Sequence, residues 1–281
     1  MTAGPVLVRE LAPAKLNLVL QVGPPRDDGL HPLCSLFAAI DLADEVVVAP
    51  TGFGGDTIEC PGVEGQNLAT AALEAFRRSA GAGLPPLAVR IAKRVPVAAG
   101  LGGGSADAAA VLRAANRITG DPLATDDLRI LAGELGSDVP SQVEPCHQLV
   151  QGVGEVLEPI ELPPLTAVLV PASEGLSTAA VYAELDRSGG WREPLDPEAV
   201  RRLAASTPDE LATALDNDLE PAALSLRPDL EDTLERLRAA GAPAAAISGS
   251  GPTCFALFPD RAAAEAAAAQ IEGALVSPLA A

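Results

Sequence analysis

The strongest constraint on the fold of this chain is a run of nearly bare backbone that joins two regular elements. Residues 97–111 read VAAGLGGGSADAAAV, in which positions 100 and 102–104 are glycine and the next residues favour helix. The preceding residues, 87–95, alternate apolar and polar side chains as a half-buried strand does. A strand, a glycine-rich loop and a helix must therefore follow one another directly, which is typical of α/β folds.

Strands and helices alternate along the rest of the chain as well. Periodicity predicts strands at residues 11–22, 44–49, 87–95, 165–171 and 253–258, and helices at residues 67–80, 124–136, 196–206 and 227–240. Further helices are expected after the glycine loop, ending at Gly120, and in the alanine-rich stretch that closes the chain. The predicted fold class is α/β (α+β). A domain boundary is expected near Pro163 and Pro164, where the composition becomes loop-like.

The chain is acidic, with a formal net charge of −19 over 281 residues. Nucleic acids and anionic membranes require a basic surface, so no nucleic-acid or membrane partner is expected. No apolar run approaches the roughly 18 residues of a membrane span, and residues 1–10 show no leader pattern, so a cytoplasmic protein is expected. The cysteines lack C-x-x-C spacing, which argues against zinc and against a disulfide framework; they are Cys34, Cys60, Cys146 and Cys254.

The glycine loop is suited to binding a phosphate. Without side chains, successive N–H groups can converge on one oxyanion, and a helix N-terminus adds partial positive charge there. Ser105 is expected to cap that helix and to offer its hydroxyl to phosphate or metal. The alternative is a turn whose glycines only allow the helix to pack closely on the strand.

Two familiar nucleotide-binding motifs do not fit this loop. Walker A requires a lysine after its last glycine, and no lysine lies between Gly100 and Ser105. The dinucleotide motif requires a third glycine where Ser105 stands and an acidic residue at a strand end about 20 positions later. Asp121 lies there, but in a Gly-Asp-Pro turn. The loop must therefore bind phosphate in another way, if it binds phosphate at all.

Two charged residues are candidates for chemistry on a phosphate acceptor. Asp138, in the short loop GSDVP, could orient an alcohol and take its proton as the alcohol attacks a phosphoryl group. Lys15, on the polar face of the first strand, could stabilise the charge of the transition state. Taken singly, each residue also fits an ordinary role, Asp138 as a turn or cap residue and Lys15 as a solvated strand residue.

Several motifs in order along the chain resemble the GHMP kinase superfamily. They are APAKLNLVLQV (12–22), DDGLHPLCSLFAAIDLADE (27–45), PVAAGLGGGSADAAAVLRAAN (96–116), LGSDVP (135–140), GVGE (152–155), GLSTAAVY (175–182), NDLE (217–220) and SGSGPTCFALF (248–258). The glycine loop alone indicates only the superfamily. The A-P-A-K-x-N start and the D-G-x-H loop resemble the members that phosphorylate a cytidine diphosphate sugar alcohol in isoprenoid precursor synthesis.

The resemblance implies a two-domain GHMP kinase fold with the active site in the cleft between the domains. Residues 1–160 would form the ATP-binding domain and residues 161–281 the C-terminal GHMP kinase domain. ATP would be the phosphate donor, with Mg²⁺ to neutralise charge during transfer. The expected partners are ATP and the small-molecule acceptor, and the protein would be a monomer or weak homodimer.

The resemblance also implies roles for individual residues. By motif position Asp138 would be the catalytic base, and Lys15 would stabilise that carboxylate and the transferring charge. Residues implied for ATP are Pro96, Val97, Ala98, Ala99, Gly100, Leu101, Gly102, Gly103, Gly104, Ser105 and Ala106 in the loop, with Lys93 and Asn67 lining the nucleotide pocket. Residues implied for the acceptor are Asn17, His31 at the cytosine edge, Tyr182 stacked on the ring, and Gly249, Ser250 and Gly251 near the diphosphate.

The chain departs from the superfamily pattern at a few positions. Leu30 stands where tyrosine is usual before the histidine, which removes one stacking face for the base. Ser141 and Gln142 follow GSDVP where aromatic residues are usual, and residues 144–151 are polar. His147, in that polar stretch, has no role that the resemblance assigns. These departures bear on affinity for the acceptor more than on the type of reaction.

Three other functions remain open at this point. A related GHMP kinase could act on homoserine, mevalonate or a sugar with the same glycine loop. A serine hydrolase could use SGSGP, but Ser248 stands where the nucleophile elbow needs glycine, and only His31 or His147 could serve as base. A GHMP-fold protein could bind nucleotide without catalysis, although the presence of both Lys15 and Asp138 speaks against this.

Overall fold

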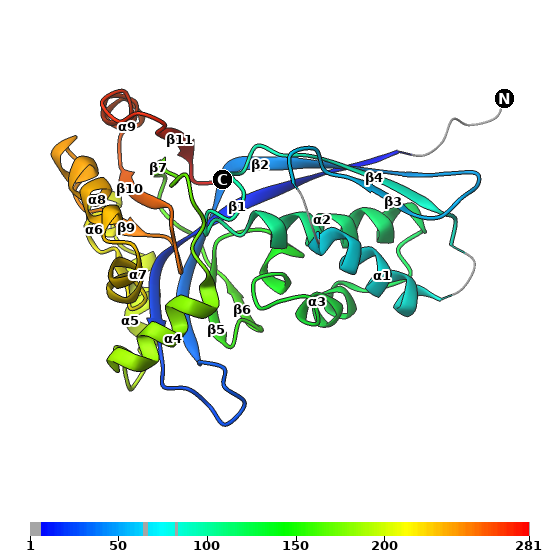
Figure 1. Ribbon diagram of the computed structural model, residues 1–281, viewed down its shortest axis with the longest axis horizontal. Coiled ribbons are helices and arrows are strands. Elements are labelled where there is room, and N and C mark those ends of the chain that lie inside the picture. Colours follow the sequence, from blue (N-terminus) through cyan, green and yellow to red (C-terminus); the bar gives the residue numbers. More distant parts are fainter. Residues whose placement is uncertain (1–6, 64–66, 82–83, 281) are drawn as a thin grey trace. The chain divides into compact units, whose positions relative to one another are not determined.

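The computed structural model describes residues 7–63, 67–81 and 84–280 (Figure 1). The expectation about a leader rests partly on residues 1–6, which lie outside this range. The strands are β1 (Val8–Val22), β2 (Leu33–Pro50), β3 (Thr57–Glu59), β4 (Leu87–Ala92), β5 (Gln148–Gly152), β6 (Val156–Pro159), β7 (Thr166–Val170), β8 (Asp216–Asn217), β9 (Ala246–Ile247), β10 (Cys254–Phe258) and β11 (Leu275–Pro278). The helices are α1 (Leu68–Ala80), α2 (Gly103–Ile118), α3 (Thr125–Gly133), α4 (Thr178–Ser188), α5 (Pro197–Ala204), α6 (Pro208–Thr213), α7 (Glu220–Leu226), α8 (Asp229–Ala239) and α9 (Arg261–Ala268), with a 3₁₀ turn, η1 (Pro140–Gln142).

The chain divides into two compact units, each built from separate segments. The first comprises residues 1–14, 42–97 and 102–145, and the second comprises residues 15–41, 98–101 and 146–281. The long strands β1 and β2 each give one part to each unit. The boundary expected between residues 160 and 161 lies inside the second unit.

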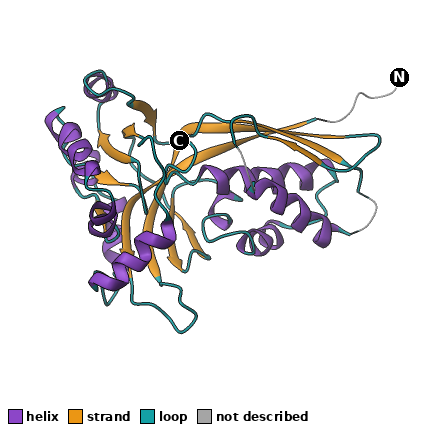
Figure 2. Cartoon of the chain, viewed as in Figure 1, coloured by secondary structure: helices purple, strands orange, loops and turns teal. Residues whose placement is uncertain are grey.

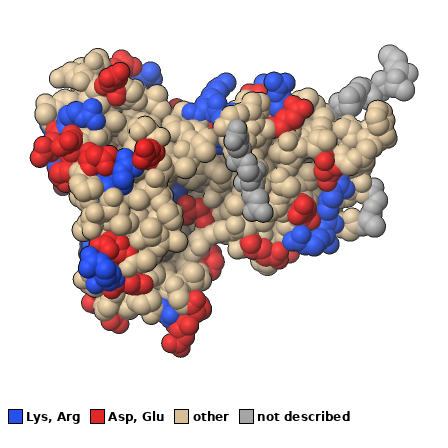
Figure 3. Space-filling model, in the orientation of Figure 1, with Lys and Arg blue, Asp and Glu red and all other residues tan. Residues whose placement is uncertain are grey.

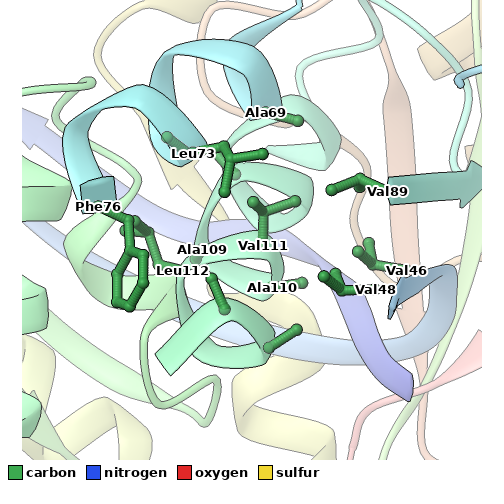
Figure 4. Packing of buried hydrophobic residues seen from close by; sticks show 14 of the residues in the cluster. Val46, Val48, Ala69, Leu73, Phe76, Val89, Ala109, Ala110, Val111 and Leu112 are labelled. Atoms are coloured by element: carbon green, nitrogen blue, oxygen red, sulfur yellow. The ribbon is translucent and has the colours of Figure 1, made fainter. Parts of the chain in front are cut away.

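The first unit is a sheet covered on one side by helices. The last residues of β2, Glu45–Pro50, pair antiparallel with β4, and β4 pairs parallel with β3. Alternate residues such as Val46, Val48 and Val89 point from these strands into a core that α1 and α2 complete (Figure 4). The alanines on α2 present little bulk, so α2 can lie close to both the sheet and α1.

The second unit contains a four-stranded antiparallel sheet in the order β11-β7-β10-β9. All residues of β7 and β10 are buried, which explains their continuous apolar sequences. Residues from α4, α7, α8 and α9 pack with this sheet and with the end of β1 in one hydrophobic cluster. In the same unit the start of β2 pairs with β5, and β8 pairs parallel with β1.

The mixed α/β fold class is confirmed, as are most of the expected elements (Figure 2). One strand is longer than its pattern indicates, because the alternation predicts a strand only at residues 44–49 whereas β2 begins at Leu33. Residues 34–40 are buried on both faces, so they show no alternation of apolar and polar residues. Helix α4 is amphipathic over only three turns and was not expected.

His147 has a structural role in the second unit. Its Nδ1 accepts a hydrogen bond from the backbone N–H of Ala39 at 3.2 Å, and its Nε2 donates to the carbonyl of Ala280 at 2.8 Å. Burial lowers the pKa of His147, which matches the neutral ring that these two bonds require. The histidine therefore ties β2 to the end of the chain.

On the face drawn in Figure 3, Lys and Arg side chains of the described residues are interspersed with Asp and Glu. This mixture agrees with the many ion pairs within the units, such as Arg201 with Glu158. In the part of the chain that the structure describes, the helices are all too short or too polar to cross a membrane.

Candidate active site

Residues 98–101 of the glycine loop lie in the second unit, against the loop of residues 248–251. Gly100 has φ 74°, a left-handed conformation that disfavours any side chain. A Cβ on Gly100 would lie 2.4 Å from the carbonyl oxygen of Gly251 and 2.8 Å from that of Ser248. The hydroxyl of Ser248 donates to the carbonyl of Gly100 at 3.2 Å. At this position glycine is needed for the close approach of two backbones.

The remaining loop residues start α2 in the first unit. Gly102 is the N-cap, with φ 69° and ψ 12°, and the helix begins at Gly103. The expectation that Ser105 caps the helix is therefore wrong: Ser105 lies in the first turn, because glycine can adopt the left-handed conformation that this cap requires. A Cβ on Gly103 would meet Val95 at 2.9 Å, whereas Gly104 faces open space.

Lys93, just after β4, lies beneath the start of α2. Its Nζ donates to Asp44 on β2 and, at 2.7 Å, to Asp107 on α2. Asp44 also accepts from the backbone N–H groups of Arg94 and Val95. Burial lowers the pKa of Lys93, but hydrogen bonds with Asp107 and Asp44 outweigh that effect and raise it. The lysine is thus a charged, largely buried link between sheet and helix.

Asp107 should make stability depend on pH. Burial raises the pKa of Asp107 from 3.8 to about 6 and outweighs the opposing effect of Lys93. The folded protein therefore binds the proton of the Asp107 carboxyl more tightly than the unfolded chain does. When that proton is lost as pH rises from about 4 to about 6, the folded state loses stability. We expect the free energy of unfolding of Asp107→Asn, relative to the unmodified chain, to rise between about pH 4 and pH 6 and then to level off. Urea unfolding across this range measures it, and a difference that does not change with pH would contradict the assignment.

Lys15 and Asn17 lie side by side on β1 in the second unit. Lys15 Nζ donates to Asn17 Oδ1 at 2.6 Å and lies 4.4 Å from the centre of the Phe37 ring. Asn17 Nδ2 donates to Ser35 Oγ at 2.9 Å. The alternation along β1 had placed both side chains on one face, and this is confirmed. The Lys15 ammonium is largely buried, and its contacts with the amide oxygen of Asn17 and the ring of Phe37 hold it in one orientation.

Two other segments meet this pair within the second unit. The backbone N–H of Lys15 donates to the carbonyl of Leu101 at 3.0 Å, and a Cβ on Gly249 would lie 3.0 Å from Asn17 Oδ1. Ser250 Oγ lies 2.9 Å from Thr178 Oγ1 at the start of α4. The structure therefore brings together Lys15, Asn17, residues 98–101 and residues 248–251.

Asn217 supports this arrangement, although sequence reasoning gave it no role. Its Nδ2 donates to the carbonyls of Ile247 and Gly249, each at 2.8 Å. It thereby fixes the loop that faces Lys15. The sequence did mark Asn217 as part of the NDLE motif, but that motif lies far from this loop in the sequence, so the contact could not be inferred.

Asp138 lies in the first unit, in the turn that leads into η1. Its carbonyl accepts from the hydroxyl of Ser141 at 2.7 Å, which closes the turn. Arg113 on α2 donates at 2.6 Å to the carbonyl of Leu11 and also to that of Gln142. The arginine therefore fixes the segment after Asp138 and the start of β1 to the same helix. Nothing in the sequence pattern indicated this role for Arg113.

The remaining predicted residues divide between the units. Asn67, in the first unit, is the N-cap of α1, where its side chain accepts from the N–H of Ala69 at 2.9 Å. His31 and Tyr182, in the second unit, lie with their ring centres 5.1 Å apart. Leu30, beside His31, is 48% exposed. The two residues that the resemblance implies for the cytosine base, His31 and Tyr182, therefore lie in contact, and His31 is buried.

Comparisons of the chain with known proteins agree with the family resemblance that these motifs suggest. The model of the GHMP kinases N terminal domain matches residues 67–144, and that of the GHMP kinases C terminal domain matches residues 198–276. The chain is 46% identical, over 94% of its length and 84% of the relative's, to 4-diphosphocytidyl-2-C-methyl-D-erythritol kinase of Anaeromyxobacter dehalogenans. The chain belongs to this kinase family. The relative of Nocardia farcinica with the same name is 43% identical over 97% of this chain and 91% of its own.

Solved structures agree with this family. A crystal structure of 4-(cytidine 5′-diphospho)-2C-methyl-D-erythritol kinase matches 98% of this chain and 100% of its own with a TM-score of 0.84 and 35% identity. Mevalonate kinase of L. major, with a TM-score of 0.71 and 16% identity over 99% of this chain and 97% of its own, shares the fold. The resemblance to the GHMP kinase superfamily is confirmed, and the chain is a kinase that uses ATP as phosphate donor.

Proposed function

We propose that this kinase transfers the γ-phosphoryl group of ATP to the 2-hydroxyl of 4-diphosphocytidyl-2-C-methyl-D-erythritol, in the non-mevalonate route to isoprenoid precursors. The observation that carries the proposal is the Lys15–Asn17 pair, held against residues 98–101 and 248–251. Lys15, Asn17 and these two segments belong to motifs by which the chain resembles the kinase family. The acceptor itself is taken from the names of the relatives.

In the proposed mechanism Asp138 accepts the proton of the acceptor hydroxyl as its oxygen attacks the γ-phosphorus. A bond forms between that oxygen and phosphorus while the bond to the β-phosphate oxygen breaks, and ADP leaves with the electron pair. Lys15 stabilises negative charge that builds up on the transferring group. Its contacts with Asn17 and Phe37 keep the ammonium from reorganising during the reaction.

The start of α2 is proposed to bind the ATP phosphates. Gly104 is exposed with no atom near its Cβ position, so phosphate could reach the backbone N–H groups of the first turn. Among the described residues no group of three or more His, Cys, Asp or Glu could hold a metal ion. We therefore propose that Mg²⁺ is held mainly by phosphate oxygens, together with the hydroxyl of Ser105, and that it neutralises charge there.

Other functions find less support. A homoserine kinase at 19% identity and the mevalonate kinase of L. major at 16% share the fold, and identities this low do not indicate which acceptor this chain uses. For a serine hydrolase, a histidine would have to activate Ser250, but His31 is held by Gly23 and His147 by Ala39 and Ala280. The charged residues of phosphoryl transfer are present, which speaks against a binding protein without activity.

The experiment that tests the proposal is ADP release from ATP and Mg²⁺ with a panel of acceptors. We expect turnover with 4-diphosphocytidyl-2-C-methyl-D-erythritol, and none above background with homoserine, mevalonate or galactose. Turnover with one of the other alcohols instead would keep the kinase and move the acceptor. ATP binding without turnover of any acceptor would favour a binding protein.

A further inference from the structure

Two neighbouring strands, β1 and β2, each give a pair of alternate side chains to the site around Lys15 (Figure 1). Lys15 and Asn17 lie on one face of β1, and Ser35 and Phe37 lie on one face of β2. The Asn17 amide contacts Ser35, and the Lys15 ammonium contacts the ring of Phe37. All four residues belong to the second unit. Of these four, Ser35 has no part in the proposed mechanism.

Ser35 makes hydrogen bonds on two sides. Its hydroxyl donates to the carbonyl oxygen of Val19 at 2.6 Å and accepts from Asn17 Nδ2 at 2.9 Å. The residue is 0% exposed, so its side chain is out of reach of a substrate. Any effect of Ser35 on the reaction must therefore pass through Asn17.

The hydrogen bonds that run from Lys15 through Asn17 and Ser35 to Val19 all have the same direction. A carbonyl oxygen can only accept, so the hydroxyl hydrogen of Ser35 points to Val19 and its oxygen is left to accept. The Asn17 amide must therefore present its NH₂ group to Ser35 and its oxygen to Lys15. An ammonium can only donate, so Lys15 requires the same orientation of the amide. Because both ends agree, the amide cannot turn over without losing both bonds.

We propose that Ser35 is a positioning residue for phosphoryl transfer, which holds the amide oxygen of Asn17 against the Lys15 ammonium. The inference rests on the proposed function, in which Lys15 stabilises the transferring charge. Without the hydroxyl, the buried Nδ2 of Asn17 would lose its acceptor, and the amide would turn or shift to find another. Its oxygen would then no longer fix Lys15 Nζ, which lies 2.6 Å away. A charge that must reorganise during the reaction stabilises the transition state less.

The kinetic test compares ADP release by the unmodified chain, Ser35→Ala and Ser35→Thr with the cytidine acceptor. We expect Ser35→Ala to lower kcat by about tenfold or more, which is the value of a hydrogen bond to a charged group, and to leave the KM for ATP unchanged. Ser35→Thr keeps a hydroxyl and should retain most of the rate. The matched control is Ser206→Ala, just after α5, which removes a hydroxyl that donates to the carbonyl of Leu203 at 2.6 Å. It should turn over like the unmodified chain.

A purely structural role for Ser35 would give a different result. Ser35→Ala would then be less stable in urea but would keep its kcat per folded molecule, and this would overturn the proposal. An equal loss of kcat in Ser206→Ala would overturn it as well. So would a folded Ser35→Thr variant that is no faster than Ser35→Ala.

The hold on the Asn17 amide can be tested without phosphoryl transfer. The side-chain amide protons of Asn17 give an NMR signal that is identified by its absence in Asn17→Asp. We expect these protons to exchange slowly with solvent in the unmodified chain and in Ser35→Thr, and about tenfold or more faster in Ser35→Ala. An exchange rate that Ser35→Ala does not change would overturn the inference. Slow exchange in a chain that phosphorylates no acceptor would count against the proposed function and not against the hold of Ser35 on Asn17.

Discussion

Asp138→Asn should lower the rate of phosphoryl transfer by about 10²–10⁴ and leave ATP binding nearly unchanged. The magnitude is the usual contribution of a general base. Asparagine has the shape of aspartate but cannot take the proton of the acceptor hydroxyl. The turn should survive, because it is closed through the carbonyl of Asp138 and the hydroxyl of Ser141, which the substitution leaves in place.

ADP release with the cytidine acceptor, together with calorimetric titration of ATP, checks this prediction. Asp209→Asn is a suitable control, since Asp209 is an exposed carboxylate in the first turn of α6. It should turn over at the rate of the unmodified chain. If Asp138→Asn retained that rate too, the assignment of the base would be wrong. If it lost ATP binding in parallel with turnover, Asp138 would have a role in the nucleotide site instead.

The sequence could predict the position of a residue where that position depends on a local pattern. The period of two along β1 put Lys15 and Asn17 on one face, and their side chains are in contact. The glycines predicted either a loop that binds phosphate or a turn that lets the helix pack closely on the strand, whereas Gly100 packs against the backbone of Gly251. Ser105 shows the limit of this reasoning, because a serine is a good cap by type but the left-handed Gly102 takes that position.

What could not be predicted depends on contacts between distant parts of the chain. Asp44 is 49 residues from Lys93, and its position on the strand alone does not say that it holds the lysine. Asn217 reaches a loop about 30 residues later in the chain, again through a contact that only the fold creates. The two units also take alternate segments, so a single boundary near residue 160 could not describe them. Local propensity has no information about such pairings.

Gly100→Ala should destabilise the second unit strongly. Alanine must adopt the left-handed φ of 74°, which costs about 1–2 kcal/mol. Its Cβ would also lie 2.4 Å from the carbonyl oxygen of Gly251, so one of two backbone segments must move, at a typical overpacking cost of about 1–3 kcal/mol. The free energy of unfolding, measured with urea, should fall by roughly the sum of these two effects. Turnover should fall as well, because the Lys15 N–H is bonded to the adjacent Leu101.

Gly104→Ala separates this packing effect from a general intolerance of side chains in the loop. Gly104 lies in the first turn of α2 and a Cβ there would meet nothing within 4 Å, so stability should hold or rise by about 0.5–1 kcal/mol, since alanine favours helix more than glycine does. If phosphates approach the first turn of α2, however, the new methyl group would stand in their way and ATP would bind more weakly. Stable folding with lost ATP affinity in Gly104→Ala, beside unstable folding in Gly100→Ala, would assign close packing to one glycine and phosphate access to the other. Equal stability losses in both variants would contradict this division.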